Sequence, residues 1–140
     1  MNVALFQTGI PRLQAKVAVA GYPYGGVLTT PSLTFGRLAD LRGLDGEDAV
    51  KRLSLTAQDG DAGGPVFDNG GAVLGMLLPL TNKNGQVLPA DVTFALDADV
   101  ILASLDAAGI SAETTDTQAL MPPETLILRA VDNTVLVSCW

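Results

Sequence analysis

The feature that most constrains this fold is a series of short apolar runs separated by clusters of glycine, asparagine, aspartate and proline. The clearest case is the segment PVFDNGGAVLGMLLP at residues 65–79, in which two apolar runs flank Asp68, Asn69, Gly70 and Gly71. Two apolar runs joined by such a turn predict a β-hairpin. A chain of this kind folds by pairing strands, so the sequence predicts an all-β or mostly β protein.

Other segments show the composition or the alternation that is typical of strands. They are residues 16–26, 32–44, 51–58 and 90–96, each bounded by turn-forming residues. Residues 97–109 differ, because their apolar side chains repeat with a helical period. Asp97 is a suitable N-cap and Gly109 a suitable stop for a helix. We therefore expect one short helix near residues 97–108.

Residues 110–140 differ in composition from the rest of the chain. Residues 111–124 are polar and rich in proline, which is typical of a linker. Residues 125–140 predict a closing hairpin that turns at Asp132 and Asn133, with a helix over the first half as the alternative. We therefore divide the chain into a β-rich domain at residues 1–109 and a linker with a C-terminal extension at residues 110–140.

The composition argues against several classes of function. The net charge is -7 and the isoelectric point is about 4.2, so the long-range field repels phosphate backbones and we expect no nucleic-acid partner. No apolar run approaches the roughly 20 residues of a membrane helix, so we expect no membrane insertion. Residues 1–10 lack a basic start followed by an apolar run and do not form a secretion signal.

The chain contains no histidine and one cysteine, Cys139. A single cysteine excludes an intrachain disulfide and a cysteine-based metal site, and we expect neither a metal nor a cofactor. The absence of histidine excludes a Ser-His-Asp triad, a Cys-His dyad and a histidine-ligated zinc site within this chain.

Four segments resemble one family. Residues 60–65 read GDAGGP, and the stretch GDAGGPVFDNGGAVLGM is similar to the Gly-Asp-Ser-Gly-Gly-Pro segment of trypsin-like serine peptidases. GYPYGG at residues 21–26 resembles the Gly-x-Pro-Phe-Gly element of bacterial HtrA-type members, and SLTFG at residues 32–36 resembles their next strand. VTFALDADVI at residues 92–101 resembles the strand that leads to their final helix. The four segments occur in the family's order, and the resemblance covers residues 10–108.

The resemblance implies that the chain is the second, six-stranded Greek-key barrel of a two-barrel fold. In this family the catalytic histidine and aspartate come from the first barrel, so we expect the chain to be a fragment without that barrel. Loss of one barrel exposes the apolar face at which the two barrels meet. We therefore expect the missing N-terminal barrel, or a second copy of this chain through homodimerisation or strand exchange, as the partner. A bacterial origin and a periplasmic or secreted location are implied by the resemblance alone.

The resemblance places Ala62 at the position of the nucleophilic serine. The N–H groups of Gly60 and Ala62 would form the oxyanion hole, since glycines let the backbone turn both amides toward a substrate carbonyl. A methyl group has no lone pair and no proton to transfer, so Ala62 cannot attack a peptide bond. The remaining residues of the motif are Asp61, Gly63, Gly64 and Pro65.

Two assignments in this region have alternatives. Asp61 is either a turn residue that caps nearby N–H groups or an acid that pairs with a freed N-terminus, as in trypsin-like members. The resemblance implies a side-chain pocket without charge at its base, suited to small or apolar side chains. Its lining would be Thr56, Leu77, Leu78 and Pro79, and the alternative is that these four are core strand residues.

Two functions are compatible with these residues. The first is a natural non-catalytic homologue, or pseudopeptidase, that acts as a binding or scaffolding module of a bacterial envelope protein with a peptide or protein ligand. The second is a trypsin-like serine endopeptidase whose nucleophilic serine has been replaced by alanine and whose first barrel is absent. We favour the first, because a serine-to-alanine substitution made to inactivate the enzyme has little use in a fragment that already lacks the catalytic base. In both cases this chain alone is inactive. The four ordered matches argue against an unrelated β-rich domain with a chance motif.

Overall fold

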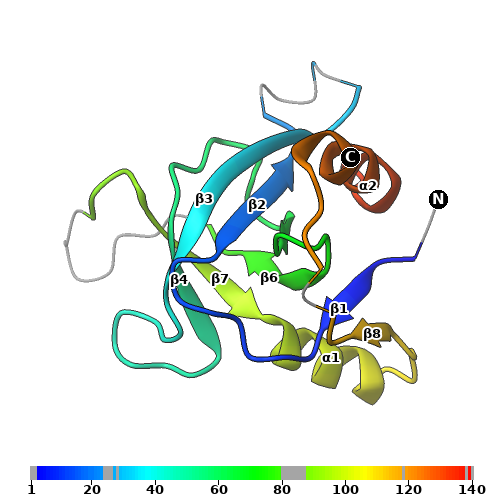
Figure 1. The fold of residues 1–140 in the computed structure, drawn as a ribbon, viewed down its shortest axis with the longest axis horizontal. Helices are drawn as coiled ribbons and strands as arrows, with labels where there is room; N and C mark the ends of the chain where they lie inside the picture. Colours follow the sequence, from blue (N-terminus) through cyan, green and yellow to red (C-terminus); the bar gives the residue numbers. More distant parts are fainter. Residues whose placement is uncertain are drawn as a thin grey trace.

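The computed structural model describes residues 3–23, 27, 29–79, 88–117, 119–137 and 139 (Figure 1). This part of the chain forms seven strands, followed by a helix, a short strand and a second helix. The elements are β1 (Leu5–Gln7), β2 (Lys16–Gly21), β3 (Ser32–Asp40), β4 (Val50–Ser54), β5 (Pro65–Phe67), β6 (Val73–Leu77), β7 (Val92–Asp97), α1 (Ala98–Ala107), β8 (Glu113–Thr115) and α2 (Pro123–Asn133).

Six of the strands close into a barrel. Their order is β5-β2-β3-β4-β7-β6, and β6 returns to pair with β5. Every neighbouring pair in the barrel is antiparallel. Outside the barrel, β1 joins β6 in parallel with Phe6 opposite Val73, and β8 joins β1 in parallel. The predicted mostly β fold with a six-stranded barrel is confirmed.

The barrel interior is filled by aliphatic side chains. In β2 they alternate with outward residues as the pleat of a β-strand requires, since Val17 and Val19 belong to this cluster and Ala18 and Ala20 do not. No charged residue belongs to this cluster. Its buried members are Val17, Val19, Leu38, Leu53, Leu55, Val66, Leu74, Leu77 and Ala95.

The predicted hairpin is formed by β5 and β6, and its turn is held by a buried carboxylate. The Oδ1 atom of Asp68 accepts hydrogen bonds from the N–H groups of Gly70 at 2.8 Å and Ala72 at 2.9 Å. The Oδ2 atom accepts one from Nε2 of Gln7 at 2.9 Å, so the turn also anchors β1. Gly71 has a φ of +82°, a conformation that favours glycine.

The predicted short helix is α1, which begins directly after β7. Asp97 occupies the N-cap position, but its carboxylate makes no capping hydrogen bond and lies 3.5 Å from Nζ of Lys51. The helix ends where predicted, because Gly109 adopts a φ of +76°. Gly109 and Ile110 each donate a 2.9 Å hydrogen bond to a carbonyl of the last turn, which is the Schellman arrangement.

The predicted hairpin at residues 125–140 is wrong, and the alternative of a helix over its first half is correct. Pro123 stands at the start of α2, where the first N–H groups have no helical acceptor, so the missing donor has no consequence. Leu126 and Ala130, four residues apart, lie on one face and are buried. Burial of this face favours a helix, although the segment contains β-branched residues that are common in strands. Asp132 and Asn133, where the hairpin was predicted to turn, lie in the last turn of the helix.

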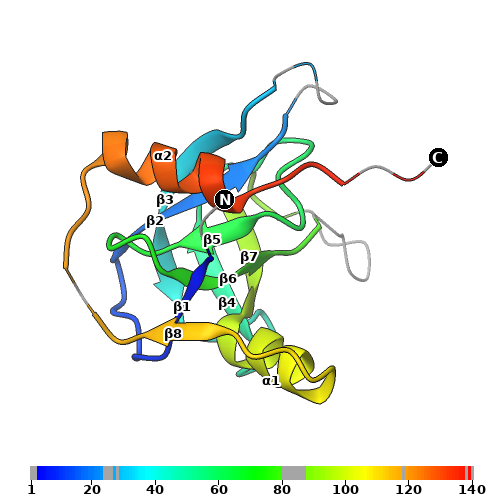
Figure 2. The same cartoon turned by 90° about the vertical axis from the view of Figure 1, so that its right-hand side faces the viewer.

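Helix α2 covers an apolar patch on the outside of the barrel. Figure 2 shows α2 lying beside β2 and β3, on the opposite end of the molecule from α1. The patch and the helix form a second core, which is separate from the barrel interior. Its buried members are Ala18, Ala20, Phe67, Val73, Leu126 and Ala130. One apolar outer face of the barrel is therefore covered by the chain itself.

The extension is fixed to the barrel at both ends of α2. Ahead of the helix, the N–H of Met121 donates to the carbonyl of Asn69 at 2.7 Å, in the β5–β6 turn. After the helix, the hydroxyl of Tyr22 donates to the carbonyl of Thr134 at 3.2 Å. These contacts hold the helix in register on the barrel surface.

Docking of α2 predicts different effects for two neighbouring leucines. Leu126 is 4% exposed, so Leu126→Ala should lower the free energy of unfolding by about 2 to 4 kcal/mol. Leu128 is 67% exposed, so Leu128→Ala should change it by less than about 0.5 kcal/mol. Urea unfolding of dilute protein, followed by circular dichroism, measures both values. Equal effects would show that α2 does not pack on the barrel.

Candidate functional site

The GDAGGP motif lies in the loop that leads into β5, and we call residues 58–64 the motif loop. Gly60 and Gly63 have φ values of +93° and +83°, which side chains other than glycine rarely adopt. A Cβ atom on Gly60 would overlap the carbonyl of Tyr22, and one on Gly64 would overlap the carbonyl of Ala20. The glycines therefore serve both the conformation of the loop and its close approach to the end of β2.

Backbone hydrogen bonds fix the motif loop between β2 and β6. The N–H of Tyr22 donates to the carbonyl of Gly60 at 3.2 Å. The N–H of Gly63 donates to the carbonyl of Leu77 at 2.8 Å, and the N–H of Leu77 donates to the carbonyl of Gly64 at 2.9 Å. The loop is therefore held from both sides.

Ala62 lies exposed at the centre of this loop. Within the described ranges, neither its N–H nor that of Gly60 donates a hydrogen bond to another residue. Donors that stabilise an oxyanion must be left available for the ligand in this way. The arrangement is compatible with the predicted oxyanion hole, which stays a prediction.

Asp61 is buried, with 1% of its surface exposed. Its Oδ2 atom accepts a hydrogen bond from the N–H of Gln58 at 2.9 Å, and its own N–H donates to the carbonyl of Gln58 at 3.1 Å. A Cβ atom at Gly21 would overlap Oδ1 of Asp61, so β2 carries a glycine where the carboxylate packs. Among the ion pairs that the described residues form, none involves Asp61. Within the described residues, Asp61 thus caps the N–H of Gln58, as in the first of the two alternatives.

The four predicted pocket residues lie in different environments. Leu77 is 1% exposed and packs in the barrel interior, whereas Thr56 and Pro79 are exposed. Leu78 is half-buried, and its N–H donates to the carbonyl of Phe94 at 2.9 Å. Residues 80–87, which follow Pro79, lie outside the described residues. The structure gives Leu77 a core position, and the pocket role of the four residues stays a prediction. Pro65, the last residue of the motif, is half-buried at the start of β5.

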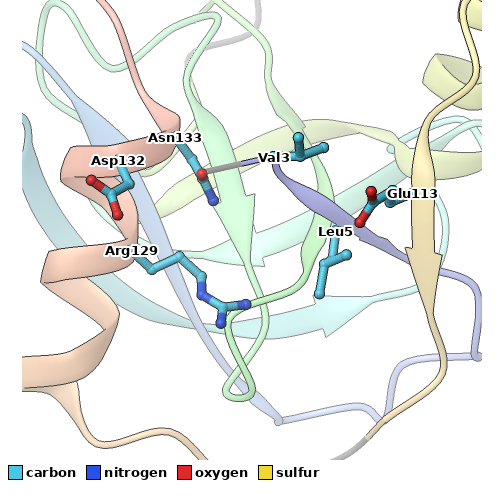
Figure 3. A pocket seen from close by; sticks show the side chains of 6 residues that line it. All are labelled: Val3, Leu5, Glu113, Arg129, Asp132 and Asn133. Carbon is cyan, nitrogen blue, oxygen red and sulfur yellow. The ribbon is translucent and has the colours of Figure 1, made fainter. Parts of the chain in front are cut away.

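A pocket that the sequence did not indicate lies between α2 and the parallel strands β1 and β8 (Figure 3). Its volume is about 400 Å³, and it shares no residue with the GDAGGP motif. In Figure 3 Arg129 reaches from α2 toward Leu5, and Glu113 approaches from β8. The residues that line it are Val3, Leu5, Glu113, Arg129, Asp132 and Asn133. It depends on where α2 docks, which the sequence pattern did not specify.

The part of the chain that is described has neither a cluster of metal ligands nor a membrane-spanning helix. Its cysteine, aspartate and glutamate side chains form no group of three that could hold a metal ion. Its helices include none with the length and apolar character needed to cross a membrane.

A comparison with protein families matches residues 3–76 to the trypsin-like peptidase domain. Among curated proteins, the uncharacterized protein y4bJ of Sinorhizobium fredii (strain NBRC 101917 / NGR234) is 34% identical over 135 residues. That alignment covers 91% of this chain and 21% of y4bJ. The chain therefore spans about a fifth of this relative.

Solved structures of proteases resemble the chain in fold. The Rv3671c protease in its inactive form is 28% identical with a TM-score of 0.58, over 76% of this chain and 55% of the protease. A serine-to-alanine mutant of Rv3671c from M. tuberculosis H37Rv is 27% identical with a TM-score of 0.59, over 84% of this chain and 56% of that one. A variant of the HtrA-type protease AlgW, solved with a decapeptide, shares the fold at 21% identity and a TM-score of 0.56, over 76% and 33%.

The geometry of the motif loop predicts unequal costs for two glycine substitutions. Gly63 has open space around the Cβ position, so Gly63→Ala should cost only the conformational strain of about 1 to 2 kcal/mol. Gly60→Ala adds a clash with the backbone of Tyr22 and should cost about 3 kcal/mol or more. Thermal and urea unfolding of both variants measures the difference. Similar costs would mean that the loop does not approach β2 as described.

Proposed function

Because the chain belongs to the trypsin-like peptidase family, we propose that it is a non-catalytic member, a pseudopeptidase domain that binds a peptide or protein segment. One observation carries the proposal: the motif loop leaves the amides of Gly60 and Ala62 without an acceptor among the described residues, but Ala62 at its centre has no attacking atom. None of the 140 residues is a histidine, so the chain also lacks the usual base. This chain therefore cannot cleave a peptide bond through an acyl-enzyme at position 62.

Binding does not require the missing groups. The amides of Gly60 and Ala62 have no acceptor within the described residues, and two convergent N–H groups attract a carbonyl oxygen or a carboxylate. The loop that presents them is held in this conformation by two glycines at positive φ and by the buried carboxylate of Asp61, which accepts the N–H of Gln58. The ligand class that fits is a peptide, with its carbonyl or terminal carboxylate against these amides.

We propose that this domain works within a larger bacterial protein. The support is that the chain corresponds to a fifth of y4bJ and to just over half of the Rv3671c protease chains. The partner proposed for the Ala62 side of the barrel is an N-terminal barrel of the same fold. A periplasmic or secreted location in the cell envelope is proposed from the resemblance to HtrA-type proteases.

A second candidate is a serine endopeptidase whose nucleophilic serine has been replaced by alanine. One of the similar solved structures is itself a serine-to-alanine mutant of a protease, which favours keeping this candidate. Activity would then require serine at position 62 together with a histidine and an aspartate from outside these residues. The two candidates differ in what happens when the hydroxyl is restored.

Restoring the hydroxyl should not create a reactive serine. In the longest natural polypeptide that contains these residues, Ala62→Ser should leave reaction with a fluorophosphonate probe at background, because the proposal requires that residues outside this chain also supply no base to activate the serine. In-gel fluorescence measures the labelling, with Rv3671c protease as the positive control and circular dichroism as the check of folding. Strong labelling, or a natural codon for serine at position 62, would establish the second candidate.

Peptide binding should be seen at the two free amides. An acetylated peptide that ends in a leucine carboxylate should shift the ¹⁵N–¹H resonances of Gly60 and Ala62, because the N–H groups donate to the carboxylate. The same peptide with a C-terminal amide lacks the charge and should bind more weakly. Titration followed by NMR gives both affinities. If neither peptide shifts these resonances, binding of a peptide terminus at the motif loop is excluded.

A further inference from the structure

The pocket of Figure 3 has a size and a lining that suit a small ligand. It offers about 400 Å³ between α2 and the strands β1 and β8, which is within the range of cavities that hold small molecules in proteins. Val3 and Leu5 supply apolar surface, and Glu113, Arg129 and Asp132 supply charges. None of the lining residues belongs to the motif loop, so a ligand in this pocket lies apart from the proposed peptide site.

Arg129 is held in place at this pocket, but it has no anionic partner among the described residues. Its aliphatic stem packs so closely on Gly71 that a Cβ atom there would lie 3.1 Å from Cδ of Arg129. Its Nη1 atom donates a long hydrogen bond, 3.4 Å, to the carbonyl of Gly71. No described carboxylate forms an ion pair with this half-buried guanidinium, although the chain has 15 acidic residues and 8 basic ones. A half-buried charge without a partner favours a ligand that brings an anion.

Glu113 supplies the opposite charge from another wall of the pocket. In Figure 3 it approaches from β8, whereas Arg129 reaches in from α2. Within the described part of the chain, the carboxylate of Glu113 forms no ion pair, with Arg129 or with any other cation. The two side chains therefore line one space without neutralising each other, and a ligand can lie between them.

The charges of the lining determine which ligands fit the pocket. A simple anion meets net repulsion, because the carboxylates of Glu113 and Asp132 outnumber the guanidinium of Arg129. A simple cation suits the carboxylates but leaves Arg129 without an anion. A zwitterion satisfies both signs, with its carboxylate on the guanidinium and its ammonium toward Glu113. The apolar surface of Val3 and Leu5 suits an aliphatic side chain on the same molecule.

We propose that the pocket of Figure 3 binds a small zwitterion of the α-amino-acid type with an aliphatic side chain. The carboxylate of the ligand accepts hydrogen bonds from Arg129, its ammonium group donates to Glu113, and its side chain contacts Leu5. This site does not depend on the proposed peptide site. The motif loop offers two N–H donors, whereas the pocket offers a cation and an anion together, so the two sites select different ligands.

Titration of the ¹⁵N-labelled chain with L-leucine, followed by NMR, tests the proposal. Leucine should shift the amide resonances of Leu5, Glu113 and Arg129 with a Kd of about 1 mM or below, because a ligand of this size makes few contacts. N-acetyl-leucine lacks the ammonium group and leucinamide lacks the carboxylate, so each should bind about tenfold or more weakly. The resonances of Gly60 and Ala62 report on the motif loop separately, so failure of the proposed function leaves this result unaffected.

Arg129→Gln and Glu113→Gln each remove one of the two charges and should weaken leucine binding about tenfold. The matched controls Arg12→Gln and Glu124→Gln change exposed residues outside the lining and should bind leucine like the unmodified chain. Melting followed by circular dichroism checks the fold of each variant, and the exposed position of Glu113 makes its variant the safer of the pair. The proposal is overturned if about 10 mM leucine shifts none of the pocket resonances, if all three ligands bind equally, or if the controls lose as much binding as the pocket variants.

Discussion

The close approach of the motif loop to the end of β2 is the contact on which the site depends. Three backbone positions meet there without side chains: Gly21 lies against the carboxylate of Asp61, and Gly60 and Gly64 lie against the carbonyls of Tyr22 and Ala20. A Cβ atom at any of the three would overlap its neighbour, so the approach is possible only with glycine. The conformation of the loop therefore depends on its contacts with the barrel strands and on glycines that permit those contacts. It does not require a hydroxyl at position 62.

Under the proposed function, this separation of backbone from side chain would explain how a peptidase loop can persist without peptidase chemistry. The amides of Gly60 and Ala62 belong to the backbone and survive the replacement of a serine by alanine. Nucleophilic attack, in contrast, needs an oxygen or sulfur atom and a base within hydrogen-bond reach. Under the proposed function, recognition and cleavage thus depend on different atoms, and this chain has only the backbone amides that would recognise a ligand.

The β5–β6 hairpin and α1 could be predicted because each has a local signal, whereas the six-stranded barrel was predicted from the resemblance to trypsin-like peptidases. Asp68 and the two glycines after Asn69 specify a turn by their own chemistry, and Gly109 specifies a helix end. Local signals did not decide whether the residues of α2 form a helix or a strand. Its residues include β-branched side chains, and the helix is stabilised when Leu126 and Ala130 meet Phe67 and Ala18, which lie far away in the sequence. The pocket beside Arg129 was missed for the same reason.

The buried amide of Gln7 has a consequence for the chain as a whole. Its Nε2 atom donates to Asp68 at 2.9 Å and to the carbonyl of Thr117 at 3.0 Å, and its Oε1 atom accepts from the N–H of Gly9 at 2.9 Å. One side chain near the start of the chain thus secures both the central hairpin and the segment that leads into α2. The stability of the segment that leads into α2 therefore depends on Gln7. Proteolytic removal of the first residues up to Gln7 would weaken the attachment of that segment to the barrel.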